Sequence, residues 1–256
     1  MSDIPVSTKW TLDAAGEIGR TSVTSVFMII STKTQTKGTG FLLSNGYIIT
    51  NEHVVRNNVS TDIMARSSFG EQITFSKLIT DTERDLAILL PSTKITGGLN
   101  LGDDCKVEVG SLVSTWGFPL EYNGPSPLLS VGYLAGFKEY SSKSGIIKHL
   151  VVNGAFNPGN SGGPLFLSND NKVIGIVSSK HAPITEFQKS ALDALSNNKS
   201  GLIFTATDKQ GTQTTFSESQ LVADLLLHFR TLTQVMIGEA ISVNELKTFL
   251  KEQSIT

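Results

Sequence analysis

Residues 157–166 read NPGNSGGPLF, a stretch in which one serine, Ser161, stands among glycines and prolines. Because glycine lacks a Cβ atom, it adopts backbone conformations closed to other residues, and neighbouring amides can turn toward one point. A serine in this setting can present its hydroxyl while those amides face an oxygen bound beside it, as a nucleophile with its oxyanion hole does. A glycine-rich hairpin or bulge in a β protein gives the same pattern without chemistry. The nucleophile interpretation therefore requires a base and an acid elsewhere in the chain.

The composition excludes several classes of protein. The chain has 256 residues, of which 39% are hydrophobic and 17% charged, with a formal net charge of -2. These values are typical of a globular protein, and no basic stripe supports a nucleic-acid partner. No stretch approaches the roughly 18 apolar residues that cross a bilayer, so we expect no membrane partner. The single cysteine, Cys105, excludes an internal disulfide and a cysteine-based zinc cluster.

Short predicted strands separated by turns fill the chain from about residue 18 to residue 180. Apolar and β-branched runs stand at residues 39–43 and 47–50, and Ser44-Asn45-Gly46 between them is a hairpin signal. Turns at this density are typical of an all-β sandwich or barrel. Residues 1–16 are polar, and we expect an irregular arm there.

Helical patterns appear after residue 184. Apolar residues recur at helical spacing over residues 185–196. Ser217 with Gln220, and Ser242 with Glu245, are capping-box pairs that predict the starts of two further helices.

The chain has four histidines, and one of them is a candidate base. His53 directly follows a predicted strand, where a side chain is held firmly and stays accessible. His149 and His181 lie at strand-edge or loop positions, and His228 lies on a predicted helix, where structural or exposed histidines are more typical.

Asp85 is the candidate acid. It precedes the apolar run of residues 86–90, so it stands where surface gives way to core. A buried acid can hold the tautomer of an imidazole and stabilise the imidazolium that forms. Pairing of Asp85 with Arg84 or another base is an equally good interpretation of this position alone. The order His53, Asp85, Ser161 places base and acid in the first half of the chain and the nucleophile in the second.

Several segments, in this order, resemble the trypsin-like serine proteases of the chymotrypsin fold, and among them the HtrA (Deg) branch. The segments are residues 38–41 with 47–55, residues 85–89, residues 110–119 with 130–132, and residues 157–165 with 173–176. Residues 237–242 are a weaker match to the strand before the last helix of that family. The resemblance covers about residues 18–180 and 235–252, and the common order of the segments is more specific than any one of them.

The resemblance implies an all-β fold with added helices. Two six-stranded antiparallel β-barrels are expected, with the active site in the cleft between them and helices at the C-terminus. The expected boundaries are an N-terminal arm at 1–17, an N-terminal barrel with His53 and Asp85 at 18–100, a C-terminal barrel with Ser161 at 101–241, and a C-terminal helix at 242–256. An insertion at 181–234 within the C-terminal barrel either shapes the substrate pocket or only enlarges the core.

The resemblance also implies a reaction, the hydrolysis of peptide bonds by a serine endopeptidase through an acyl-enzyme intermediate. Ser161 would attack the scissile carbonyl, His53 would act as general base and then as acid, and Asp85 would orient His53. The backbone amides of Gly159 and Ser161 would form the oxyanion hole. This mechanism requires no metal and no organic cofactor, and we expect neither.

Substrate contacts follow from the same resemblance. The residues implied are Ser178, Ser179 and Lys180 on the edge strand that pairs with an extended peptide, and Ala155, Phe156 and Val177 around the first specificity pocket. No acidic residue stands where a pocket for lysine or arginine needs one. We therefore expect a small to medium apolar side chain before the cut.

The chain departs from the family at two points. Asn160 stands where activated digestive proteases carry the aspartate that pairs with a new N-terminus, so activation by that route is not expected. Only a predicted helix and a few residues follow residue 241, so we expect no PDZ domain of the kind usual in the HtrA branch. Two alternatives to a constitutive protease stay open: a protease-fold module that binds peptides without cutting, and a latent enzyme that a partner activates.

Partners and location are predicted from these features and from what the sequence lacks. We expect a protein or peptide substrate, with a regulatory protein as a second candidate partner. Family members often associate through N-terminal aromatic residues, and Trp10 is the candidate contact for such a homo-oligomer. The N-terminus lacks the basic and apolar regions of a secretory signal, which favours a cytoplasmic location.

Overall fold

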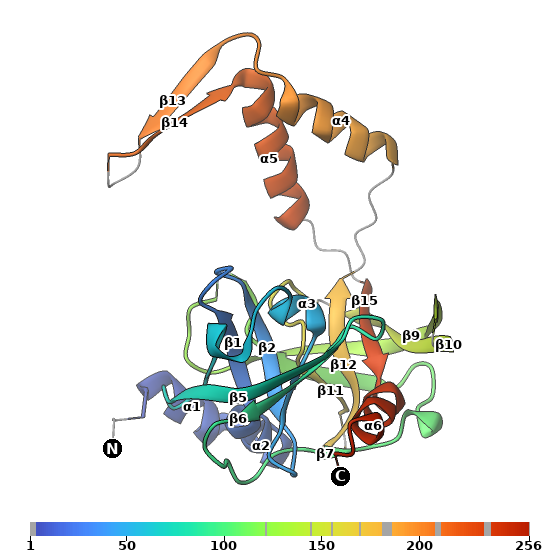
Figure 1. The fold of residues 1–256 in the computed structure, drawn as a ribbon. Coiled ribbons are helices and arrows are strands. Elements are labelled where there is room, and N and C mark those ends of the chain that lie inside the picture. The colour runs from blue at the N-terminus through green and yellow to red at the C-terminus, as the bar shows by residue number, and fades with distance from the viewer. Residues whose placement is uncertain are drawn as a thin grey trace. The chain divides into compact units, whose positions relative to one another are not determined.

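The computed structural model describes residues 4–120, 122–143, 145–154, 156–168, 170–180, 186–207, 211–232 and 237–255. The chain divides into two compact units, Met1–His181 with Met236–Thr256, and Ala182–Val235. The first unit contains two β-barrels (Figure 1). All the candidate catalytic residues belong to this unit.

The N-terminal barrel closes from six antiparallel strands in the order β1, β2, β3, β6, β5, β4. Their bounds are β1 (Val26–Ser31), β2 (Lys37–Leu42), β3 (Ile48–Thr50), β4 (Ile63–Arg66), β5 (Gln72–Asp81) and β6 (Leu86–Pro91). Apolar and β-branched side chains fill its interior, as such residues pack well on a pleated surface, and Ile29, Ile48 and Leu89 are fully buried there. A short helix, α3 (Glu52–Val55), and a 3-10 turn at Ser60–Asp62 connect β3 to β4.

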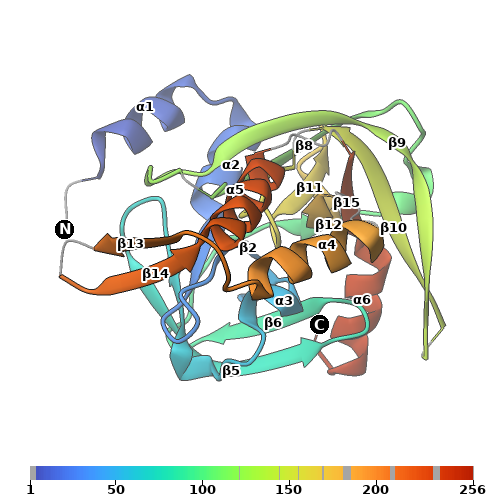
Figure 2. The same cartoon turned by 90° about the horizontal axis from the view of Figure 1, so that it is seen from above.

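The C-terminal barrel follows the order β11, β8, β9, β10, β15, β12, and it closes because β11 also pairs with β12. Its strands are β8 (Leu112–Gly117), β9 (Leu128–Ser142), β10 (Gly145–Gly154), β11 (Pro164–Leu167), β12 (Lys172–Lys180) and β15 (Ile237–Ser242). β9 and β10 run side by side as one long hairpin (Figure 2), and β7 (Asn100–Leu101) adds to β12 in parallel. The expected pair of six-stranded barrels is confirmed.

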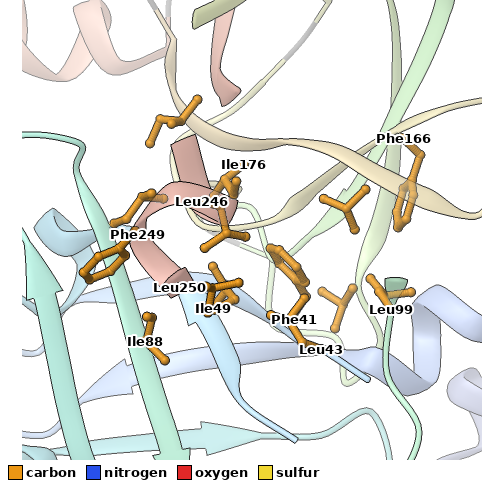
Figure 3. Close-up of a cluster of buried hydrophobic side chains, with 14 of the residues drawn as sticks. Phe41, Leu43, Ile49, Ile88, Leu99, Phe166, Ile176, Leu246, Phe249 and Leu250 are labelled. Carbon is orange, nitrogen blue, oxygen red and sulfur yellow. The ribbon is translucent and has the colours of Figure 1, made fainter. Parts of the chain in front are cut away.

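A shared hydrophobic core joins the two barrels to the C-terminal helix α6 (Val243–Glu252) (Figure 3). Phe41 and Ile88 come from the N-terminal barrel, Phe166 and Ile176 from the C-terminal barrel, and Phe249 from α6, all buried at 2% exposure or less. Burial of this apolar surface is the main force that holds the barrels at a fixed distance, and a cleft between them needs that distance to be constant.

The N-terminal residues differ from the expected arm and strand. They form two helices, α1 (Val6–Ala14) and α2 (Glu17–Ser25), before β1 begins. The buried face of α2 includes Gly19, where an added Cβ atom would lie 3.2 Å from the Trp116 ring. Thr8 of α1 is buried and donates a hydrogen bond to the Ser68 carbonyl at 2.8 Å. These contacts are with distant parts of the chain, and tertiary packing of this kind overrides local propensity.

The unit Ala182–Val235 contains α4 (Glu186–Asn197), β13 (Ile203–Thr207), β14 (Gln213–Ser217) and α5 (Glu218–Leu232). The capping box predicted at the start of α5 is present: the Ser217 amide donates to Gln220 Oε1 at 2.9 Å, and the Gln220 amide donates to Ser217 Oγ at 3.3 Å. Ser242 caps α6, but Glu245 accepts a bond from the Lys148 amide instead of closing a box. Across the described residues, no helix has both the length and the apolar character needed to cross a membrane.

Candidate active site

His53 and Asp85 are brought together by the pairing of two strands. β3 pairs with β6 so that Thr50 lies opposite Ala87, and each candidate stands just beyond the paired segment. His53 Nδ1 lies 2.8 Å from Asp85 Oδ2 and 3.0 Å from Oδ1. The His53 backbone amide donates to Asp85 Oδ1 at 2.9 Å. The carboxylate thus fixes both the ring and the backbone of the histidine.

Asp85 is itself held from two other directions. Its φ is 54°, in the left-handed region, which aspartate tolerates better than most residues. Asn51 Nδ2 donates to its carbonyl oxygen, and Ser178 Oγ donates to its Oδ2, each at 2.9 Å. Ser178 belongs to the C-terminal barrel, so this bond crosses the cleft.

Arg84 does not take Asp85 as its partner. Its guanidinium contacts Asp81 Oδ2 at 2.5 Å, Glu252 Oε2 at 2.9 Å and Glu245 Oε2 at 3.4 Å, and the side chain is only 13% exposed. Burial disfavours the cation, but hydrogen bonds to Glu252 and Asp81 outweigh it and raise the pKa of Arg84 above its ordinary value. Since Glu245 and Glu252 belong to α6, Arg84 ties the turn that carries Asp85 to the C-terminal helix.

We expect Arg84→Met to lower the free energy of unfolding by about 2–3 kcal/mol, because it leaves three carboxylates close together without their cation. The turn at Asp85 loses its anchor, so kcat should fall about tenfold at unchanged KM. Chemical denaturation and steady-state kinetics measure the two effects. Arg84→Lys is the matched control, because it keeps the charge but not the forked geometry. Its stability and its kcat should lie between those of Arg84→Met and those of the natural protein. Equal stability of Arg84→Met and the natural protein would contradict the role of this cluster.

Ser161 stands in the loop between β10 and β11, where two glycines are required. Gly159 has φ 95°, and a Cβ atom there would lie 2.4 Å from the Phe118 carbonyl oxygen. Gly162 has φ 88°, and a Cβ atom there would lie 2.0 Å from the Thr39 carbonyl oxygen. No side chain fits at such distances, so the sequence pattern reflects close approach of the loop to its neighbours.

The backbone hydrogen bonds of residues 158–162 leave two amides free. The carbonyl oxygens of Pro158 and Asn160 accept from the Leu120 and Gly163 amides at 2.7 and 2.9 Å. Those of Gly159 and Ser161 accept from Thr39 Oγ1 at 2.6 Å and from the Thr39 amide at 2.8 Å.

The amides of Asn160 and Gly162 donate to Asn157 and Val177. By contrast, the amides of Gly159 and Ser161 have no hydrogen-bond partner within the described part of the chain. Gly159 is buried and Ser161 is partly buried. Backbone amides in such positions are usually paired, so two free ones in one loop are candidate donors to an external acceptor.

The Ser161 hydroxyl donates to the Ser178 carbonyl oxygen at 2.8 Å. No hydrogen bond joins it to His53 among the residues described. Contacts of this kind are often long or misaligned without substrate and tighten in the complex, and a rotation about χ1 is enough to redirect the hydroxyl.

A cavity of about 420 Å³ opens beside these residues. The residues that line it are His53, Arg56, Asp85, Phe156, Asn157, Pro158, Ser161, Val177 and Ser178. Phe156 is 1% exposed, and an added Cβ atom at Gly238 would lie 2.3 Å from its ring. The aromatic ring therefore fills space on this side of the cavity. Among the other expected substrate contacts, Ala155 lies outside the described residues, and Ser179 and Lys180 are placed only as backbone of β12.

Sequence reasoning did not identify three residues at the site: Asn51, Thr39 and Arg56. Arg56 pairs with the buried Glu52 at 2.6 Å, and this hydrogen bond raises the pKa of Arg56. The spacing of four residues between Glu52 and Arg56 was an available signal for that pair. The contacts of Thr39 and Asn51 are with distant residues and leave no local pattern.

The remaining histidines have surroundings of their own, except that His181 falls outside the described residues. His149 packs beside Glu239, with Nδ1 at 3.6 Å from Oε2, and burial lowers the pKa of His149. His228 lies on α5 in the second unit. These positions fit structural or surface roles.

One cluster of metal-ligating types occurs among the described residues: Asp103, Asp104 and Cys105. A hydrogen bond from the Cys105 amide is the main reason that the pKa of Asp103 is lowered to about 2. Lys148 Nζ lies 2.9 Å from the buried Asp104 carboxylate and neutralises it. The cluster therefore gives no argument for a metal.

The chain is similar to known proteins in sequence and in fold. Residues 38–176 match the protein family described as "Trypsin-like peptidase domain". A protein of Halomonas elongata named "Probable periplasmic serine endoprotease DegP-like" is 33% identical over 140 residues, which cover 54% of this chain and 28% of that protein. The matched part thus spans less than a third of the length of this relative.

Two solved structures share the fold. One is the HtrA-type protease AlgW with a tripeptide, at a TM-score of 0.61 and 19% identity, covering 93% of this chain and 64% of that chain. The other is the Rv3671c protease of M. tuberculosis in its inactive form, at a TM-score of 0.59 and 16% identity, covering 92% of each chain.

The expected cytoplasmic location is wrong. Relatives from Halomonas elongata, Pseudomonas putida and Hahella chejuensis are all named as periplasmic proteins. The expectation used only the residues at the start of the sequence, and these carry no argument about where the protein is found.

Proposed function

The chain belongs to the trypsin-like peptidase domain family, and on that premise we propose that it is a serine endopeptidase with Ser161 as nucleophile. The relatives and solved structures that it resembles include members of the HtrA branch. In the proposed reaction Ser161 Oγ attacks the scissile carbonyl carbon, and His53 Nε2 takes the hydroxyl proton. His53 then gives this proton to the leaving amine, and water hydrolyses the acyl-enzyme that remains.

Asp85 supports the base in this proposal. Its carboxylate accepts from Nδ1, which leaves Nε2 unprotonated and able to accept the proton of Ser161. When the imidazolium forms, the same carboxylate stabilises it.

The single observation that carries the proposal is the pair of free amides at Gly159 and Ser161. All four neighbouring carbonyl oxygens from Pro158 to Ser161 are paired, so the loop keeps two donors for an oxyanion. Donors aimed in advance at developing charge are usually the largest electrostatic contribution to such catalysis. A module that only binds peptide has no use for an aspartate–histidine pair beside two free amides, which disfavours that alternative.

The proposed substrate is a peptide segment with a small to medium apolar side chain before the cut. Phe156 and Val177 line the cavity without a charge, and the Phe156 ring takes up space that a larger side chain would need. β12 is the strand that would pair with the extended substrate. Cleavage of a peptide library tests this preference, and dominance of basic or acidic residues before the cut would contradict it.

A fluorophosphonate probe tests the proposed activity. We expect it to label the purified protein once, and peptide mass mapping should place the adduct on Ser161. Preincubation with a cleavable peptide should slow labelling, because both compete for one site. Labelling only after addition of another protein would support the latent alternative, and no labelling under either condition would contradict the proposed nucleophile.

A further inference from the structure

Thr39, on β2 of the N-terminal barrel, is hydrogen-bonded through its amide and its hydroxyl to the C-terminal barrel at the serine loop. Its hydroxyl donates to the Gly159 carbonyl oxygen at 2.6 Å and accepts from the Phe118 amide at 2.9 Å. Its amide donates to the Ser161 carbonyl oxygen at 2.8 Å. The Thr39 carbonyl oxygen accepts from Thr50 Oγ1, on the neighbouring strand β3, at 2.7 Å. The Thr39 side chain is fully buried, so water does not compete for its hydrogen bonds.

These bonds fix the loop on both sides of Asn160. The carbonyl oxygens of Gly159 and Ser161 both point at Thr39, one at its hydroxyl and the other at its amide. Without the hydroxyl, the Gly159 carbonyl oxygen would be buried and unpaired. Rotation of this peptide group toward another donor would then lower the free energy of the loop. Such a turn moves the peptide groups that border the two free amides.

Asn160 does not hold the loop by its side chain. It is fully buried, and neither its Oδ1 nor its Nδ2 has a hydrogen-bond partner among the described residues. The loop is therefore held from the outside, by a residue 120 positions earlier in the sequence.

We propose that Thr39 is a positioning residue that keeps the oxyanion amides of Gly159 and Ser161 free and aimed at the substrate oxygen. This inference rests on the proposed function, and it adds that the neighbouring barrel, through one hydroxyl, fixes the oxyanion loop. The role needs a group that donates and accepts at once, which serine can replace and valine cannot.

Thr39→Val tests the role because valine keeps the shape of threonine and loses the hydroxyl. We expect kcat to fall about 100-fold, the size of losing one oxyanion donor, with KM nearly unchanged. The affinity of a peptide boronate, which forms the tetrahedral adduct, should fall by the same factor. Thr39→Ser should recover most of both losses. Thr39→Ala is the second hydroxyl-free variant, in case valine prevents folding.

Thr115→Val is the matched control. Thr115 is also fully buried, and its hydroxyl has no partner among the described residues, so this variant should keep kcat and boronate affinity within twofold. Thermal unfolding of all variants separates loss of folding from loss of positioning. If Thr39→Val stays within twofold of the natural protein, or Thr39→Ser is as impaired as Thr39→Val, the inference is wrong. Absence of cleavage and labelling in the natural protein, both alone and with another protein added, would instead refute the proposed function.

Discussion

Replacing Ser161 with alanine is expected to lower kcat by about 10⁶-fold, because no acyl-enzyme can form without its Oγ. The fold should not change, since the side chain is only partly buried and makes one hydrogen bond, to the Ser178 carbonyl oxygen. Fluorophosphonate labelling should disappear with the activity. Steady-state cleavage of a peptide selected from the library measures the loss, and thermal unfolding verifies the fold. Ser92→Ala, at an exposed serine of the N-terminal barrel, is the control.

His53→Ala and the double variant with Ser161→Ala should fall to the same floor. Base and nucleophile act in one step, so removing the second costs almost nothing once the first is gone. The floor should remain about 10³-fold above the rate in water, because the free amides of Gly159 and Ser161 still stabilise an oxyanion. If the two decreases of kcat multiply in the double variant, Ser161 is not the nucleophile. The same conclusion holds if Ser161→Ala keeps a tenth of the natural activity.

The candidate catalytic residues could be predicted because each one lies in a local sequence pattern that indicates a strand end or a turn. His53 follows a strand, Asp85 precedes one, and Ser161 lies in a glycine-rich turn. The order of the surrounding segments also predicted the two barrels. Local pattern did not give the pairing of β3 with β6 that joins His53 to Asp85. The resemblance to a family supplied only the expectation that Asp85 orients His53.

The supporting residues could not be predicted, since their partners are far away in the sequence. Arg84 contacts Glu252 on the last helix, and Thr39 contacts Gly159 in the other barrel, across separations of 168 and 120 residues. A threonine in a strand and an arginine in a turn are ordinary residues by composition. Only the folded chain shows which carbonyl or carboxylate each one meets.

The two N-terminal helices also could not be predicted, because they depend on contacts with residues far away in the sequence. Residues 6–14 and 17–25 have few large apolar residues that would indicate the buried face of a helix. Their stability comes from contacts such as Gly19 with Trp116. A short helix without tertiary packing is marginal in water, so the sequence of the segment alone could not decide its state.

Replacing Asp85 with asparagine is expected to lower kcat by about 10⁴-fold while leaving the fold intact. The two carboxylate oxygens have different neighbours. Oδ1 accepts from the His53 backbone amide, which can only donate, and Oδ2 accepts from the Ser178 hydroxyl. Both oxygens lie within reach of His53 Nδ1, and Oδ2 is the closer of the two, at 2.8 Å against 3.0 Å. The asparagine oxygen must therefore take the Oδ1 position, and its NH₂ group must take the Oδ2 position.

That orientation reverses the tautomer of His53. The NH₂ group donates to Nδ1, so the ring proton moves to Nε2, and Nε2 can no longer accept the proton of Ser161. The Ser178 hydroxyl can turn and accept from the same NH₂ group, so it does not oppose the change. Ser178→Ala is the matched control; it removes one bond to the carboxylate, keeps the tautomer and should cost only about tenfold. Imidazole ¹⁵N NMR should show a protonated Nδ1 in the natural protein and a protonated Nε2 in Asp85→Asn. If Asp85→Asn loses less than tenfold in kcat, or keeps its proton on Nδ1, Asp85 does not set the state of the base.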